Sequence, residues 1–168
     1  MAQLNPRIAA KLKRVPAVAV EAVRLAMEEG AQEIVEEMRK LVPVSDGGGT
    51  LRESIGWTWG DVPPGSFMID EIRSGKNQGE QYATLRIKIY AGSRDAFYAR
   101  FIEFGTRPHS LARNASLDRG KRQDQGGSHP GTAAQPFFFP AWKKMRAEFR
   151  KKIHARAKAA IREAWRNG

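Results

Sequence analysis

Two stretches, YARFIEFGT at residues 98–106 and PFFFPAW at residues 136–142, decide how this chain folds. Both are dense in aromatic side chains, and burying a side chain such as phenylalanine is worth about 1.5–3 kcal/mol. We therefore expect both stretches to contribute to the core and to a contact between subunits. The residues assigned to core or subunit interface are Tyr98, Phe101, Phe104, Phe137, Phe138, Phe139 and Trp142.

One carboxylate lies inside the first stretch. Glu103 is flanked by aromatic and aliphatic residues, and such apolar surroundings could raise its pKa. An ion pair with Arg100 or Arg107 is the alternative, and a structural pairing of this kind is the favoured interpretation.

The N-terminal part of the chain has the pattern of a helix over residues 6–42. Apolar residues recur there at steps of three and four, which indicates one buried face. Pro16 is expected to break or kink this helix. Gly30 should weaken its middle by about 1 kcal/mol relative to alanine. Pro43 should end it.

The period then changes from helical to two, which is typical of strands. Strands are expected over residues 55–59, 67–73 and 84–90, with a polar loop between the second and the third. In the third strand, every second residue is apolar, so one face should meet the core. A short helix is expected over residues 94–104.

Trp57, Trp59 and Tyr90 could stack on nucleic-acid bases beside Arg86 and Lys88. Aromatic residues at strand spacing more often belong to a core or to a subunit interface, and this interpretation is favoured.

The C-terminal part contains a long polar loop and a basic helix. Residues 105–135 hold almost no large apolar side chain, which is unusual for a loop of this length inside a compact domain. The last helix should begin near Pro140, and its end, residues 155–168, should project or pack on another copy. The chain, residues 1–168, is expected to form a single α+β domain: an N-terminal helix, a small antiparallel sheet of three to four strands, a long basic C-terminal helix and a long flexible loop.

The net charge of +11 lies entirely in residues 107–168, because the first 106 residues are balanced. This distribution favours an anionic partner, either nucleic acid or an acidic protein surface. A solvated helix face is an equally strong interpretation. The candidate contact residues are Arg107, Arg113, Arg119, Lys121 and Arg122 in the loop, and Lys143, Lys144, Arg150 and Lys151 on the helix.

No group of residues has the spacing of a catalytic or metal site. The chain has no cysteine, and its histidines are His109, His129 and His154. A loop metal site with Asp118 or Asp124 is conceivable, but ordinary exposed histidines are favoured. No run approaches the roughly 18 apolar residues of a membrane span, and the first residues lack the apolar core of a signal peptide. We therefore expect no enzymatic activity, no cofactor, no metal and no membrane partner.

Four segments together resemble the gene-product-ten family of Hong Kong-type siphophages. They are LVPVSDG at 41–47, GTLRESI at 49–55, YARFIEFGT at 98–106 and QPFFFPAW at 135–142. The resemblance extends over roughly residues 6 to 155. The chain departs from the family pattern in its longer first turn and in its long basic loop after Thr106.

The resemblance implies a structural virion protein at the head–tail junction of a long-tailed phage, assembled in the host bacterial cytoplasm. Related proteins form rings, typically six-fold, through which DNA passes. The expected partners are further copies of the chain and the neighbouring head-closure and tail-terminator or tail-tube proteins. A head-closure or tail-terminator protein of the same junction is the alternative. A free nucleic-acid-binding protein and a nuclease using Glu103, His109 and His129 are alternatives from other classes.

Overall fold

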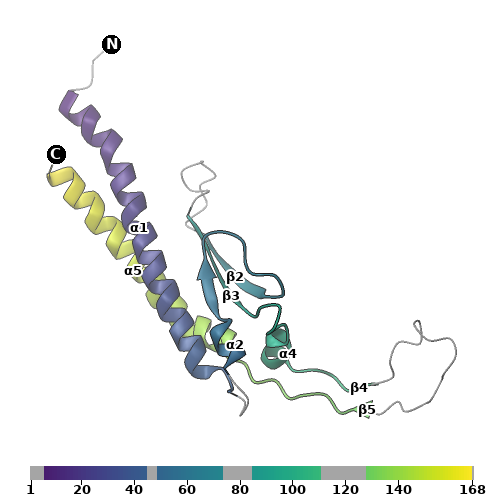
Figure 1. Cartoon of the computed structure of the whole chain (residues 1–168). Coiled ribbons are helices and arrows are strands. Elements are labelled where there is room, and N and C mark those ends of the chain that lie inside the picture. The colour runs from purple at the N-terminus through teal and green to yellow at the C-terminus, as the bar shows by residue number, and fades with distance from the viewer. Residues whose placement is uncertain (1–5, 45–48, 74–84, 111–127, 168) are drawn as a thin grey trace.

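The computed structural model describes residues 6–44, 49–73, 85–110 and 128–167. Two long helices, α1 (Pro6–Leu41) and α5 (Phe138–Arg166), lie side by side and run in opposite directions. A small sheet and two short helices pack near the end of the pair where α1 finishes and α5 begins (Figure 1). The architecture confirms the α+β prediction of a long N-terminal helix, a three-stranded antiparallel sheet and a long C-terminal helix.

A break or a kink was predicted at Pro16; helix α1 continues through this residue, so the break is wrong. Proline removes one hydrogen bond from the helix, but the loss falls in a helix of 36 residues whose first turns are held by α5. Lys11 Nζ donates to the carbonyl oxygen of Trp165 at 3.0 Å, and Arg14 Nη2 donates to that of Ala164 at 2.9 Å. The predicted end is confirmed, because α1 stops at Leu41, two residues before Pro43.

The sheet contains β1 (Gly56–Thr58), β2 (Phe67–Arg73) and β3 (Arg86–Ala91), in the order β1-β3-β2. Both pairings are antiparallel, and the last strand in the sequence lies in the middle. The apolar side chains at 85, 87 and 89 are 3%, 0% and 2% exposed, which confirms that this face meets the core. A short helix, α2 (Thr50–Glu53), precedes the sheet and was not predicted.

The core lies between this sheet, α1 and the first turns of α5. Its largest fully buried side chains come from all three elements; they are Phe137, Phe138, Met27, Ile34, Met38, Ile55, Ile87, Ile89 and Val35.

Helix α4 is restricted to Ala99–Phe104, because residues 94–98 form turns rather than the start of the predicted helix. Helix α5 begins at Phe138, two residues before the predicted start.

The two ends of the predicted loop pair with each other. Strands β4 (His109–Ser110) and β5 (Ser128–His129) are antiparallel, and an isolated bridge joins Thr106 to Thr132. The described ends of the loop therefore form a two-stranded stem that points away from the body of the protein (Figure 1). Residues 111–127 lie outside the described residues.

Candidate functional site

The buried carboxylate of Glu103 joins the two aromatic stretches. Its side chain projects from α4 to the first turn of α5 and is 2% exposed. Oε2 accepts hydrogen bonds from the backbone N–H groups of Phe137 and Phe138 at 2.8 and 2.9 Å, and Oε1 accepts one from Phe139 at 3.0 Å. These N–H groups at a helix start have no partner within the helix. A negative charge at this end also interacts favourably with the helix dipole.

Glu103 is therefore a capping group supplied from a distant helix. The predicted ion pair of Glu103 with Arg100 or Arg107 is wrong. Both carboxylate oxygens instead accept hydrogen bonds from backbone N–H groups at the start of α5. The sequence placed Glu103 among apolar residues but held no local sign of a bond to residues more than thirty positions away.

The residues after Glu103 fix the start of the loop stem. Gly105 has a φ of +69°, and a Cβ there would lie 2.6 Å from the carbonyl oxygen of Thr132. Only glycine accepts this combination without strain. Thr106 and Thr132 exchange two backbone hydrogen bonds of 2.9 and 3.1 Å, and Gln135 N donates to Ile102 O at 2.8 Å. The returning chain is thus held against the end of α4.

His109 and His129, which a long loop separates in the sequence, lie opposite each other in the stem. Their rings stack with centroids 5.0 Å apart. His109 Nδ1 donates to Arg107 O at 2.9 Å, and Gly131 N donates to His129 Nδ1 at 3.0 Å. Within the described residues, no group of three or more acidic, histidine or cysteine side chains could hold a metal ion. The aspartates proposed for a loop metal site lie outside those residues.

The predicted contact residues of the loop are only partly described. Arg107 is exposed at the base of the stem. Arg113, Arg119, Lys121 and Arg122 lie outside the described residues.

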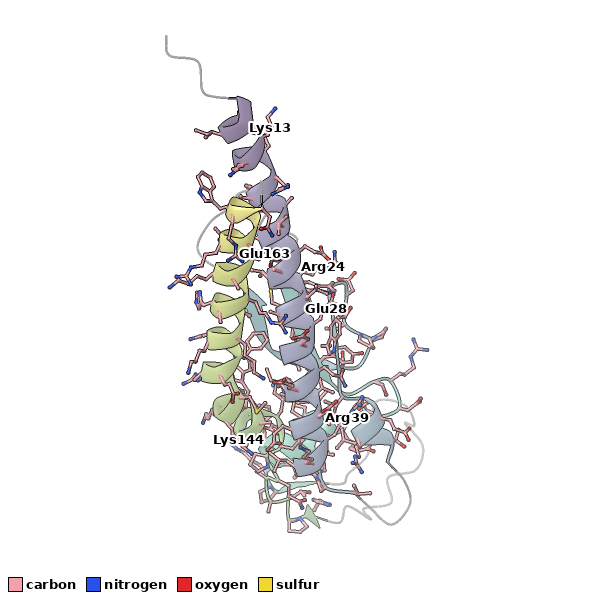
Figure 2. All side chains as sticks on the ribbon, turned by 90° about the vertical axis from the view of Figure 1, so that its left-hand side faces the viewer. Lys13, Arg24, Glu28, Arg39, Lys144 and Glu163 are labelled. Atoms are coloured by element: carbon pink, nitrogen blue, oxygen red, sulfur yellow. The ribbon has the colours of Figure 1, made fainter. Side chains whose placement is uncertain are left out.

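The four predicted contact residues of the basic helix divide into two groups. Lys143, Arg150 and Lys151 are exposed on α5. Lys144 instead donates to Glu37 Oε1 of α1 at 2.5 Å, so it is engaged within the chain. Figure 2 labels Lys144 near the start of α5.

Three acidic residues of α1, one turn apart, bind three cations of α5. Besides the pair at Glu37, Lys152 Nζ lies 2.6 Å from Glu33 Oε2, and Arg156 Nη2 lies 3.2 Å from Glu29 Oε2. Residues four apart lie on one face of a helix, so these pairs form a ladder along the α1–α5 contact. The hydrogen bond from Lys144 lowers the pKa of Glu37 below its ordinary value. The hydrogen bond to Glu33 raises the pKa of Lys152 above its ordinary value.

These two shifts predict how thermal stability depends on pH. The lowered pKa of Glu37 adds stability above its ordinary value of about 4.5, and this contribution is lost as the pH falls through the lowered pKa. The raised pKa of Lys152 adds stability below about 10.5, and it is lost as the pH rises through the raised pKa. Circular dichroism should show a melting temperature that falls at both extremes. In the Glu37→Gln variant the acidic decline should be shallower, and an identical decline would contradict the assignment.

The aromatic residues predicted for core and interface differ in burial. Phe137, Phe138 and Trp142 are buried, and Tyr98 and Phe139 are half-buried. Two others remain open to solvent: Phe101 is 49% exposed and Phe104 is 54% exposed. Phe97, which was not among the predicted site residues, is 63% exposed. We call these three residues, Phe97, Phe101 and Phe104, the α4 aromatic patch.

The tryptophans of the sheet are tied to α1. Trp57 Nε1 donates to Gln32 Oε1 at 3.1 Å, and Trp59 Nε1 donates to Glu28 Oε1 at 2.8 Å. The guanidinium of Arg24 lies over the Trp59 ring, 5.3 Å from its centroid. Figure 2 shows Arg24 and Glu28 one turn apart on α1. These contacts support the core interpretation of the two indoles over base stacking.

None of the helices in the described part of the chain combines the length and the hydropathy that crossing a membrane requires.

Comparison with known proteins identifies one family. Residues 7–105, more than half of the chain, match the model of the family described as "Bacteriophage HK97-gp10, putative tail-component". The match includes α1, the sheet and α4 with its Glu103. Searches of curated proteins and of solved structures gave no significant match. The chain belongs to the HK97-gp10-like family of bacteriophage tail components, whose members are structural proteins and not enzymes.

Proposed function

We propose that this tail component assembles with copies of itself into a ring at the head–tail junction of a long-tailed phage or phage-like particle. The observation that carries the proposal is the α4 aromatic patch. Three phenylalanines, 63%, 49% and 54% exposed, lie within eight residues of one another. Exposed aromatic clusters of this kind mark surfaces that bind other proteins.

Further exposed apolar residues lie on the helix pair, at a distance from the patch. They are Ile8, Val18 and Leu25 on α1 and Ile161 and Trp165 on α5. In Figure 1, α4 and the free ends of α1 and α5 lie at opposite sides of the molecule. A ring needs two different surfaces on each subunit, one for each neighbour. The α4 aromatic patch is suited to be one of these surfaces, and the exposed apolar residues of the helix pair are candidates for the other.

The family resemblance supports a six-fold ring with DNA passing through its lumen. The neighbours in such a particle are the head-closure protein and the tail-terminator or tail-tube proteins. Arg107 is suited to contact a neighbouring ring or DNA, because it is exposed at the base of the stem. Arg113, Arg119, Lys121 and Arg122 are further candidates because they concentrate positive charge in a segment with almost no large apolar residue. A head-closure or tail-terminator role at the same junction is the second candidate.

Imaging of purified particles tests the location. Electron microscopy with an antibody against this chain should label the junction between head and tail. Labelling confined to the distal tail, or particles that lack the chain, would overturn the proposal.

Native mass spectrometry tests the ring. The chain should give a mass near six times 18.8 kDa at micromolar concentration. The variant Phe97→Asp/Phe101→Asp should be monomeric with an unchanged melting temperature, because both side chains are exposed and a buried charge at an interface is costly. Val44→Asp, which changes a residue that is 60% exposed elsewhere, is the matched control and should retain the ring. A wild-type chain that stays monomeric at every concentration would contradict self-assembly.

A further inference from the structure

Helix α5 carries ten lysines and arginines, which fall into two groups: those paired with acidic residues of α1 and those exposed to solvent. Lys144, Lys152 and Arg156 face α1 and are bound by its acidic ladder. The remaining seven are exposed; they are Lys143, Arg146, Arg150, Lys151, Lys158, Arg162 and Arg166. Within the described residues none of these seven has an ion-pair partner.

Five of the seven form one continuous band along α5, away from the face that holds Phe149. Phe149 defines the inner face, because its ring packs where a side chain of Gly30 would otherwise lie. At 3.6 residues per turn, Lys143, Arg150, Lys151, Lys158 and Arg162 lie roughly 100–180° around the helix from Phe149. Lys144 falls at the same angle as Arg162, but its side chain reaches back to Glu37 of α1. We call these five residues the cationic strip. Figure 2 shows nitrogen-tipped side chains along the edge of α5 that faces away from α1.

The acidic residues of α5 do not interrupt this strip. Glu163 lies about 40° from Phe149 around the helix, and Glu148 lies about 100° from it on the side away from Arg150. There Glu148 approaches Lys152 at 3.9 Å. From residue 143 to residue 162 the helix rises about 29 Å. Duplex DNA presents one phosphate charge per roughly 1.7 Å of its axis. A strip of this length can therefore face many phosphates. The backbone of α5 is already ordered by its contact with α1.

The composition of the strip favours a phosphate backbone over a protein surface. Protein interfaces are centred on aromatic or apolar anchors. Between Lys143 and Lys158 the outer face holds only cations, histidine and alanine. The exposed apolar residues of α5 lie at its C-terminal end: Ile161 is next to Arg162 at the last turn of the strip, and Trp165 follows it. A contact dominated by cations is what sequence-independent phosphate binding requires.

We propose that the cationic strip of α5 binds the phosphate backbone of duplex DNA without sequence preference. This inference rests on the proposed passage of DNA through the assembly and names the surface that DNA meets. The strip remains available to DNA because the ladder cations, and not the strip cations, hold α5 on α1.

Two triple variants of equal net charge test this division. Lys143→Gln/Arg150→Gln/Lys158→Gln removes three strip cations, and Lys144→Gln/Lys152→Gln/Arg156→Gln removes the three ladder cations. Fluorescence anisotropy with a labelled 30-base-pair duplex of arbitrary sequence measures affinity across a range of salt concentrations. Each phosphate contact contributes about 0.9 to the slope of log K against log salt.

The strip variant should lose at least tenfold in affinity at 100 mM salt, and its slope should fall by about three. Its melting temperature should match that of the wild type. The ladder variant should melt at a lower temperature while its salt slope stays near the wild-type value. Equal losses of affinity in both variants would overturn the inference, because binding would then follow net charge alone. Wild-type binding that does not depend on salt would overturn it as well.

Poly-glutamate as competitor separates DNA from an acidic protein partner. If it displaces DNA as efficiently as unlabelled duplex at equal charge concentration, the strip is a docking site for acidic proteins and the inference is wrong. The outcome is independent of the ring test. A wild-type chain that has the six-fold mass but does not bind duplex DNA refutes this inference alone. DNA binding by a chain that is absent from the head–tail junction refutes only the proposed function.

Discussion

Replacing Glu103 by glutamine is expected to lower the free energy of unfolding by about 2–3 kcal/mol. The carboxylate is buried and accepts three backbone hydrogen bonds of 2.8–3.0 Å at the start of α5. A hydrogen bond to a charged group contributes about 1.5–3 kcal/mol, and a buried donor left unpaired costs about 1–3 kcal/mol. The glutamine amide can place its oxygen on one side only, so its NH₂ group must face at least one backbone N–H.

Urea unfolding measures this loss, and hydrogen exchange localises it. The amides of Phe137, Phe138 and Phe139 should exchange faster in the Glu103→Gln variant, because they lose their acceptor. Glu53→Gln changes an exposed carboxylate and should stay within about 0.5 kcal/mol of the wild type. A variant that is destabilised while these three amides keep their protection would show that Glu103 does not act as a cap.

The helices and strands could be predicted from the sequence, whereas the contact that Glu103 makes could not. Periodicity identified the long helices and all three strands, because a buried face repeats every 3.6 or every two residues. The strand over residues 67–73 has the predicted bounds, and the buried face of β3 was correct. Periodicity reports which side of an element is buried and carries no information about which element covers it.

Contacts between distant parts of the chain were therefore missed. The ladder on α1 consists of Glu29, Glu33 and Glu37, which in the sequence are ordinary charges on a helix. The four-residue spacing of these glutamates indicates that they share one face of α1. It does not identify their partners, which lie more than a hundred residues away in the sequence. Lys144 was consequently assigned to an external partner although it is bound within the chain.

Helix-breaking residues were judged by local propensity, and tertiary packing overrides propensity. Pro16 was expected to break or kink α1, yet the helix continues, and contacts from Lys11 and Arg14 to the end of α5 hold the turns before it. Gly30 was interpreted as a weak point, which is true of an isolated helix. In the folded chain the Phe149 ring occupies the space that a side chain at residue 30 would fill.

Replacing Gly30 by alanine is therefore expected to destabilise the protein by about 1–3 kcal/mol. Helix propensity alone predicts the opposite sign, a gain of about 1 kcal/mol. A Cβ on Gly30 would lie 2.1 Å from Cδ2 and 2.4 Å from Cε2 of Phe149. The Phe149 ring is 3% exposed and packs against Trp142, so it has no open space into which to move. The helices must separate, and separation weakens both the core and the ladder.

A double-mutant cycle with Phe149→Leu distinguishes this steric cause from a loss of helix stability elsewhere. Leucine is smaller, so the Gly30→Ala change should cost less in the Phe149→Leu background, with a coupling of about 0.5–3 kcal/mol between the two sites. Urea unfolding of the wild type, both single variants and the double variant gives this coupling directly. Additive effects, or a Gly30→Ala variant more stable than the wild type, would show that the glycine does not serve the helix crossing. A clear coupling would mean that the missing side chain at residue 30 sets how closely α5 approaches α1, and with it the distance across which Glu33 and Glu37 reach their lysines.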